Sequence, residues 1–210
     1  HLEKDRPAAI KIEYSHRARM ARMHLLWKKP AADSLERAVE AARKAEATVL
    51  FLGLSPRLEG EEMNVEITGF KGGDRLTLDL PANQEKLLEE VAKAAAGKPV
   101  VLVLLNGSPL AVNQAVELVP AIVEAWYPGQ AAGQAIADVL FGDYNPAGRL
   151  PVTFYKSVED LPDFSDYRMR GRTYRYFKKE PLFTFGYGLS YTSFSYSKLS
   201  APKSLKAGEE

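Results

Sequence analysis

The sequence contains no cysteine, and its 210 residues hold no run of 18 apolar residues. The lack of cysteine excludes a small fold held together by disulfide bonds. Because a helix that crosses a bilayer needs about 20 mostly apolar residues, we predict no membrane span. The charged first residues, 1–6, are not followed by an apolar segment, so no signal peptide is predicted either. These absences leave the cellular compartment open.

The chain also lacks a large excess of positive or negative side chains. The chain has 28 Lys and Arg against 27 Asp and Glu, a net charge of +1, with 46% hydrophobic and 26% charged residues. This composition is that of an ordinary globular protein. Residues 1–30 carry eight basic and three acidic side chains, but the basic residues alternate with apolar ones, as on the solvent face of a strand. We therefore expect no nucleic-acid binding by this segment.

Several common functional motifs are absent as well. The sequence has no GxxxxGK[ST] loop, no GxGxxG after a strand and no GxSxG elbow, so we predict neither a nucleotide cofactor nor an esterase triad. The three histidines all fall within residues 1–24, in a presumed hairpin. With no cysteine beside them, they do not suggest a structural metal site. We expect no cofactor and no metal.

Residues 1–30 have the period of β-strands. Apolar side chains alternate with polar ones over residues 10–14 and again over 21–27, which predicts a β-hairpin. Two strands cannot build a core of their own. We interpret the segment as the remnant of a β-module.

From residue 33 the period changes to that of an α/β protein. Helical patterns are predicted from Ser34, after Pro81, around 110–116 and over 129–141. Short apolar runs predict strands at 47–54, 100–105, 121–125 and 151–154, and another at 192–199. The alternation predicts a three-layer α/β/α sandwich with a mainly parallel sheet. In such sheets ligands bind at the carboxyl ends of the strands, so the loop 55–80 is the first candidate site.

This loop is acidic and rich in glycine. Four carboxylates lie within eight residues, Glu59, Glu61, Glu62 and Glu66. Crowded like charges and partial burial raise the pKa of a carboxyl, as a general acid near neutral pH requires. A solvated loop without a catalytic role has the same composition, so both interpretations stay open at this point.

The loop and the segments after it resemble a known family. The segments SPRLEGEEM, GFKGGDR, GKPVVLVLLNGSPLAV, EAWYPGQ, IADVLFGDYNPAGRLPVTF, GRTYRYF and FTFGYGLSYTSFSY are similar, in order, to the C-terminal α/β-sandwich domain of glycoside hydrolase family 3. The similarity covers about residues 33–195. It implies three parts: 1–30 as the end of an inserted lectin-like β-sandwich, 31–192 as the sandwich domain, and 193–210 as the start of a fibronectin type III-like domain.

The resemblance implies a role for this domain in hydrolysing terminal β-linked sugars. Family members are retaining, exo-acting enzymes such as β-glucosidases and β-xylosidases. Their nucleophile lies in an N-terminal (β/α)8 barrel, and the sandwich domain supplies the acid/base glutamate. The Gly-Glu pair of the family loop best matches Gly60-Glu61, which makes Glu61 the expected acid/base, Glu62 the second choice and Glu59 the third.

The resemblance also suggests supporting residues. We expect Asp74 and Arg75 to support the loop, and we name four candidate substrate contacts, Arg57, Met63, Phe70 and Trp126. Trp126 and Tyr127 end a predicted strand at the edge of the candidate site, and for both, packing at the margin of the sheet is favoured over stacking on a sugar. The expected partners are a β-linked glycoside and a barrel domain, with self-association through the face that docks the barrel. Such enzymes are usually secreted, periplasmic or cytoplasmic in microbes.

No barrel precedes residue 1, so we expect the isolated chain to be inactive or nearly so, because half of the catalytic pair is missing. Two other hypotheses remain. One is a non-catalytic α/β module that binds carbohydrate or a partner through the same loop. The other is a flavodoxin-like binder of small molecules, against which the missing phosphate loop argues.

Overall fold

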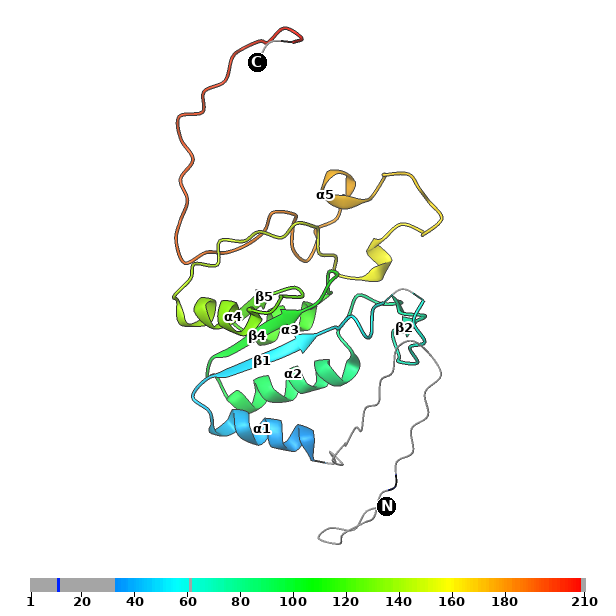
Figure 1. The fold of residues 1–210 in the computed structure, drawn as a ribbon, viewed down its shortest axis with the longest axis vertical. Helices are drawn as coiled ribbons and strands as arrows, with labels where there is room; N and C mark the ends of the chain where they lie inside the picture. Colours follow the sequence, from blue (N-terminus) through cyan, green and yellow to red (C-terminus); the bar gives the residue numbers. More distant parts are fainter. Residues whose placement is uncertain (1–10, 12–32, 61, 209–210) are drawn as a thin grey trace. The chain divides into compact units, whose positions relative to one another are not determined.

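A parallel sheet lies at the centre of the fold (Figure 1). The computed structural model describes residue 11, residues 33–60 and residues 62–208. Within them, β1 (Thr48–Gly53), β4 (Val100–Leu105) and β5 (Ala121–Glu124) form a sheet in the order β1-β4-β5, with parallel neighbours. The contacts within the chain separate residues 1–34 from 35–210, and the fold described below is that of the second unit. The hairpin expected at residues 1–30 lies outside the described residues.

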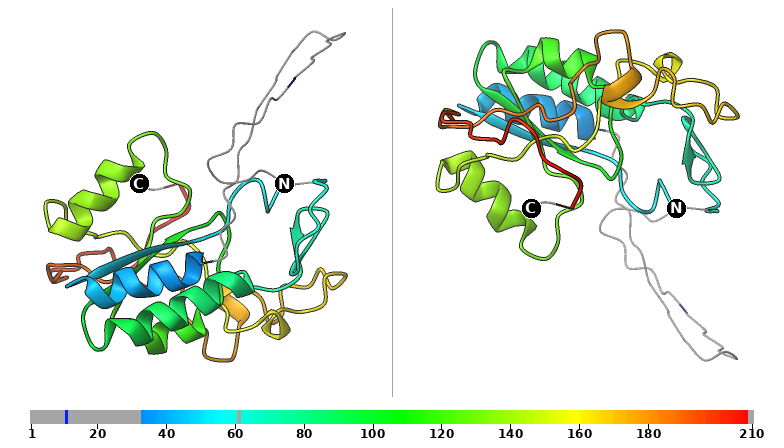
Figure 2. Two further views of the ribbon diagram at one scale, coloured as in Figure 1. Left: turned by 90° about the horizontal axis from the view of Figure 1, so that it is seen from below. Right: turned by 90° about the horizontal axis from the view of Figure 1, so that it is seen from above.

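Helices cover both faces of this sheet. The helices α1 (Ser34–Lys44), α2 (Ala82–Ala95) and α3 (Asn113–Leu118) lie on one face, and α4 (Ala132–Phe141) lies on the other (Figure 2). The predicted three-layer α/β/α arrangement is therefore confirmed. The chain leaves α2 through Ala96, which adopts a left-handed conformation with φ 51°.

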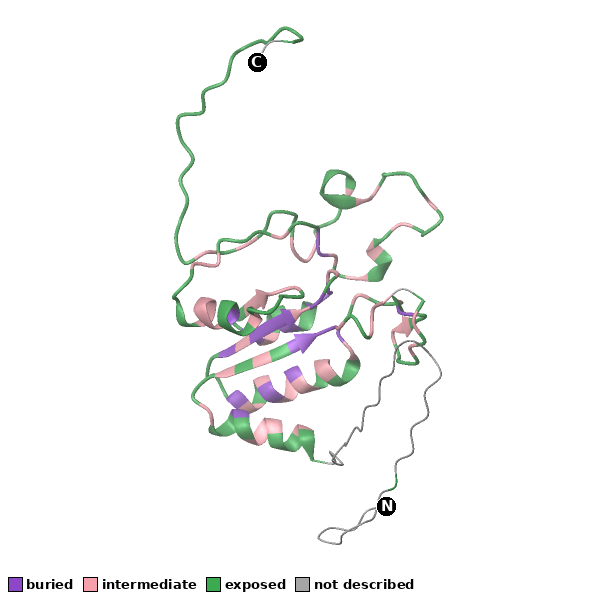
Figure 3. Ribbon diagram, in the orientation of Figure 1, coloured by how far each residue is buried: buried purple, intermediate pink, exposed green. Residues whose placement is uncertain are grey.

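The core lies between β4 and α2 (Figure 3). The side chains of Leu102 and Val103 in β4 are 0% exposed, which explains why this strand is an unbroken apolar run. Leu88 and Val91, one helical turn apart on α2, are each 1% exposed and face the sheet. Burying a leucine or valine side chain stabilises a fold by about 1.5–3 kcal/mol. The packing of α2 against β4 therefore fixes the position of both ends of β4.

The strand register brings three strand ends to one edge. Gly53 at the end of β1 is the partner of Leu105 at the end of β4, and Leu104 is the partner of Glu124 in β5. The side-chain amide of Gln84 in α2 accepts a hydrogen bond from Gly53 N–H (2.7 Å) and donates one to Gly53 O (2.8 Å). The loops that follow β1, β4 and β5 thus begin side by side.

Within the loop 55–80 the structure has a small hairpin that the sequence did not predict. Its strands are β2 (Phe70–Lys71) and β3 (Asp74–Arg75), which pair antiparallel. The turn between them is Gly72-Gly73, and both glycines have positive φ. Two residues per strand are too few to show an alternating pattern, which is why this hairpin escaped prediction.

Two predicted strands are not formed, and one helix is shifted. In place of a strand at 151–154 the structure has a single antiparallel bridge between Phe154 and Phe183, and Pro151 has no N–H with which to extend it. Residues 192–199 are exposed and irregular, since a lone strand without a partner cannot pair. The helix expected at 110–116 begins only at Asn113. Between 155 and 191 lie two short helices, η1 (Val158–Asp160) and α5 (Thr173–Tyr176).

Candidate functional site

The acidic loop is anchored to the edge of the sheet through Glu59. Its Oε1 accepts hydrogen bonds from Gly107 N–H (3.0 Å) and from the hydroxyl of Tyr127 (2.5 Å). Its Oε2 accepts one from Ser108 Oγ (2.7 Å). Gly107 and Ser108 follow β4, and Tyr127 follows β5, so one carboxylate connects the loops of all three strands.

Arg75 makes a second connection to the same turn. Its Nη1 donates to Ser108 Oγ (2.8 Å) and to the carbonyl of Pro109 (2.7 Å). Burial lowers the pKa of Arg75, while the nearby charges of Glu59 and Asp79 act in the opposite direction. Arginine remains cationic in proteins, so the guanidinium balances the anchored carboxylate. The Nη2 atom of Arg75 is buried and has no hydrogen-bond partner among the described residues.

The hairpin also closes against the acidic loop directly. A Cβ atom at Gly73 would lie 1.7 Å from the carbonyl oxygen of Gly60, so only glycine permits this contact. Met63 N–H donates to Gly72 O at 2.9 Å. These contacts hold both flanks of the segment 60–63 beside the hairpin. They border a pocket of about 420 Å³, which is lined by Glu59, Gly60, Gly73, Asp74, Arg75 and Ser108.

Two of the three candidate acid/base residues, Glu59 and Glu62, lie among the described residues, and their surroundings differ. Glu61 lies outside the described residues. Glu62 is exposed and adopts a positive φ of 52°, so the backbone makes a sharp turn there. Glu59 is the anchored residue, and both of its carboxylate oxygens already accept hydrogen bonds.

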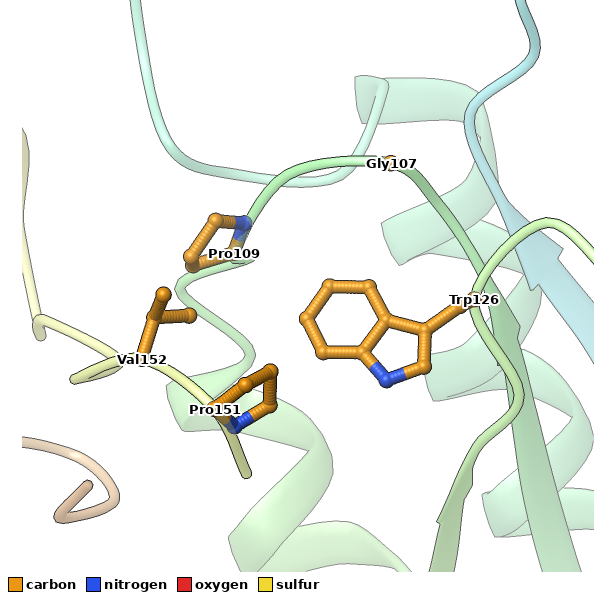
Figure 4. A pocket seen from close by; sticks show the side chains of 5 residues that line it. All are labelled: Gly107, Pro109, Trp126, Pro151 and Val152. Carbon is orange, nitrogen blue, oxygen red and sulfur yellow. The ribbon is translucent and has the colours of Figure 1, made fainter. Parts of the chain in front are cut away.

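The candidate substrate contacts do not lie together. Arg57 is exposed, and Phe70 is half-buried and packs against the hydrophobic core. The side chain of Met63 packs on Gly60. Trp126 lies elsewhere, in an apolar pocket of about 360 Å³ next to the turn that follows β4 (Figure 4). Asp74 and Arg75 both line the polar pocket.

One residue of this edge, Glu124, was missed in the sequence. Burial raises the pKa of Glu124 to about 7, although hydrogen bonds from Trp126 N–H (3.0 Å) and Asn106 Nδ2 (3.3 Å) favour the ionised form. The sequence contained the signal, because Glu124 is an acidic residue at the carboxyl end of a parallel strand, where ligand sites form. Tyr127 was noted in the sequence from its place just after that strand, but its hydrogen bond to Glu59 was not foreseen.

Comparison with known proteins assigns the family. Residues 6–191 match the model of the glycosyl hydrolase family 3 C-terminal domain. The chain belongs to this family. The resemblance seen in the motifs is therefore confirmed.

Relatives of this family 3 domain are named as xylosidases and glucosidases. A xylan 1,4-β-xylosidase of Xylanibacter ruminicola is 59% identical over 68% of the chain, which covers 16% of that protein. A periplasmic β-glucosidase of Salmonella typhimurium is 39% identical over 83% of the chain and 23% of that protein. The crystal structure of a β-D-glucoside glucohydrolase from Trichoderma reesei has a TM-score of 0.68 and 32% identity, over 80% of the chain and 24% of that structure. The chain thus spans about a fifth of the relatives that it matches.

The part of the chain that the structure describes contains no cluster of three or more His, Cys, Asp or Glu side chains that could hold a metal ion. None of its helices is long and apolar enough to span a bilayer.

Proposed function

We propose that this domain supplies the general acid/base of a retaining, exo-acting β-glycosidase that releases terminal β-linked xylose or glucose. The names of its relatives support this substrate class. The observation that carries the proposal is the anchored acidic loop. Glu59 ties it to two neighbouring strand ends, and Gly73 packs on its Gly60 carbonyl.

In a retaining mechanism two carboxyl groups act about 5–5.5 Å apart. One attacks the anomeric carbon, and the other protonates the leaving oxygen and then activates water. We propose that an N-terminal (β/α)8 barrel provides the nucleophile and that this domain provides the second carboxyl. A loop held at both flanks can place that carboxyl over the barrel with the precision that such chemistry needs.

Among the three candidates we propose Glu61 as the acid/base, with Glu62 second and Glu59 third. The hydrogen bonds of Glu59 support its low rank. To protonate a leaving oxygen, its carboxyl would have to give up one of the donors that it now holds, Gly107 N–H, Ser108 Oγ or Tyr127 OH. Glu59 serves the mechanism better as the anchor of the loop.

The test combines the chain with a separately produced family 3 barrel domain and follows hydrolysis of aryl β-xylosides and β-glucosides. We expect no turnover by the chain alone and turnover in the mixture. Loss of a general acid costs about 10²–10⁴-fold in rate. In Glu61→Gln we expect such a loss with a phenyl leaving group, a much smaller loss with dinitrophenyl, and rescue by azide that yields a β-glycosyl azide.

The same assay separates the candidates. Glu62→Gln and Glu59→Gln are measured in parallel, and Glu66→Gln serves as the control, since Glu66 is an exposed carboxylate of the same loop. Azide rescue of a variant other than Glu61→Gln would transfer the role to that residue. If no variant responds to azide or to the leaving group while the mixture is active, the domain does not supply the acid/base. It would then be a binding module.

A further inference from the structure

The turn after β4 begins with the dipeptide Asn106-Gly107. In peptides, an asparagine followed by glycine loses its side-chain amide more readily than any other, because glycine has no side chain to obstruct attack by its own nitrogen. The chain has four other asparagines, and each is followed by valine, glutamine or proline: Asn64, Asn83, Asn113 and Asn145. This turn is therefore the position where the sequence is most open to deamidation.

Contacts of the turn explain why both residues are present. Asn106 is 0% exposed, and its Nδ2 donates to Ser108 O (3.0 Å) and to Glu124 Oε2 (3.3 Å). A side chain without this amide would lose the link between the ends of β4 and β5. A Cβ atom at Gly107, which Figure 4 shows just after β4, would lie 2.7 Å from the ring of Tyr127. The fold thus keeps a reactive pair of residues for reasons of packing and hydrogen bonding.

The hydrogen bond between Gly107 and Glu59 opposes the reaction. For deamidation the nitrogen of Gly107 must lose its proton and direct its electron pair at Cγ of Asn106, within about 3–3.5 Å. In the structure this N–H points at Glu59 Oε1 (3.0 Å), so the electron pair left by the proton would point there too. The negative carboxylate also disfavours a second negative charge beside it. Asn106 Oδ1 is buried, and no donor among the described residues polarises its carbonyl group.

We propose that Asn106-Gly107 is a latent deamidation site, which the anchor of the acidic loop at Glu59 protects. When the anchor opens, hydroxide removes the proton of Gly107 N, and this nitrogen attacks Cγ of Asn106. The Cγ–Nδ2 bond breaks, Nδ2 takes up a proton and leaves as ammonia, and a cyclic imide forms. Water then opens the imide at either carbonyl and returns a proton to Gly107 N. The product is aspartate or isoaspartate at position 106.

Neither product fits the site. A carboxylate at position 106 replaces a donor by a second acceptor beside Glu124, at a residue that is 0% exposed. Isoaspartate also adds one carbon to the backbone before Gly107, which moves its N–H away from Glu59. The modification therefore removes contacts that hold the turn, and opening of the anchor becomes irreversible. This chemistry goes beyond the proposed function and does not depend on it.

Incubation of the chain in mildly alkaline buffer tests this proposal. Mass spectrometry of digested samples follows the conversion of each asparagine, with Asn113 as the internal reference. We expect position 106 to react at least about tenfold more slowly in the folded chain than in guanidinium chloride, since a protected site reacts only when it opens. Glu59→Ala should raise the rate in the folded chain about tenfold and leave the rate in guanidinium chloride unchanged.

A second variant guards against a folding defect in Glu59→Ala. Tyr127→Phe keeps the ring beside Gly107 and removes only the hydroxyl that donates to Glu59, so it should speed the conversion about fivefold. Two controls are measured with it. Tyr144→Phe removes an exposed hydroxyl elsewhere, and Val91→Ala destabilises the core away from the turn. Neither should raise the rate by as much.

Three outcomes overturn the proposal. The first is conversion at position 106 that is as fast in the folded chain as in guanidinium chloride. The second is a rate that neither Glu59→Ala nor Tyr127→Phe changes. The third is equal acceleration by Val91→Ala, which would assign the reaction to global unfolding. Failure of the proposed function is seen separately, in hydrolysis with the barrel, since the mass measurement needs no turnover.

Discussion

The hydroxyl of Tyr127 donates a hydrogen bond to Glu59 Oε1 at 2.5 Å, across 68 positions of sequence. Burial, together with the charge of Glu59, raises the pKa of Tyr127 above its ordinary value. The hydroxyl therefore stays protonated, and remains a donor, throughout the physiological range. Because Tyr127 follows β5 and Glu59 follows β1, this contact fixes the acidic loop across the whole width of the sheet edge.

Removing this hydroxyl should loosen the loop. In Tyr127→Phe we expect the free energy of unfolding to fall by about 1 kcal/mol, a moderate value because Tyr127 is 38% exposed. Urea denaturation measures the change. Amide exchange at Gly107, whose N–H donates to the same Glu59 oxygen, should become faster. Tyr144→Phe is the control, since that tyrosine is 67% exposed, and no change is expected there. Equal effects of the two variants would refute the role of the contact.

Alanine substitutions at the two glycines of the hairpin turn distinguish the cost of backbone strain from the cost of a steric clash. Gly72 and Gly73 both have positive φ, but only at Gly73 would a Cβ meet the carbonyl of Gly60. We expect Gly72→Ala to cost about 1 kcal/mol of stability from strain alone. Gly73→Ala should cost clearly more and reduce hydrolysis in the mixture with the barrel, because the acidic loop must move. Thermal unfolding and the hydrolysis rate measure the two effects. Similar losses from both alanines would show that the contact with Gly60 is unimportant.

The sequence predicted the sheet because its central strand, β4, is buried on both faces. Residues 100–105 form an unbroken apolar run, and a parallel central strand is what such a run requires. The helices α1, α2 and α4 were predicted from their apolar positions, which repeat with helical spacing. The strand predicted at residues 151–154 was wrong, because the structure has a single bridge between Phe154 and Phe183 instead of a ladder of strand hydrogen bonds. Local pattern does not show whether a partner strand is present.

The site could be predicted only in part. The acidic loop was found from its composition and its place after a strand. What could not be found was the anchoring of Glu59 by Gly107, Ser108 and Tyr127, since these contacts join positions 48–68 residues apart. The partly buried setting of Glu124 was missed for the same reason, because its partner Asn106 belongs to another strand end.

The raised pKa of Glu124 predicts that stability depends on pH. In the folded chain this pKa is about 7, against 4.5 for the unfolded group. The neutral form thus stabilises the fold fully below about pH 4.5, and this contribution is lost as the pH rises through about 7. We expect the free energy of unfolding to fall by about 2 kcal/mol between about pH 5 and about pH 8. Urea denaturation at several pH values across this range should show that the free energy of unfolding of Glu124→Gln depends much less on pH. An unchanged pH dependence in this variant would assign it to other groups.

The outer face of β1 predicts self-association of the isolated chain. Leu52 is buried on the side of the core, whereas Val49 and Phe51 are 42% and 53% exposed on the opposite face. In the sheet of the described residues β1 is also an edge strand, and exposed apolar edges promote association. We expect sedimentation velocity to show dimers or larger species at high concentration, and Phe51→Lys to shift them toward monomer. Phe164→Lys is the control, because Phe164 is 94% exposed but lies outside the sheet, and it should leave the distribution unchanged. A chain that is monomeric at every concentration, or equal responses to both lysines, would show that this face of β1 does not drive association.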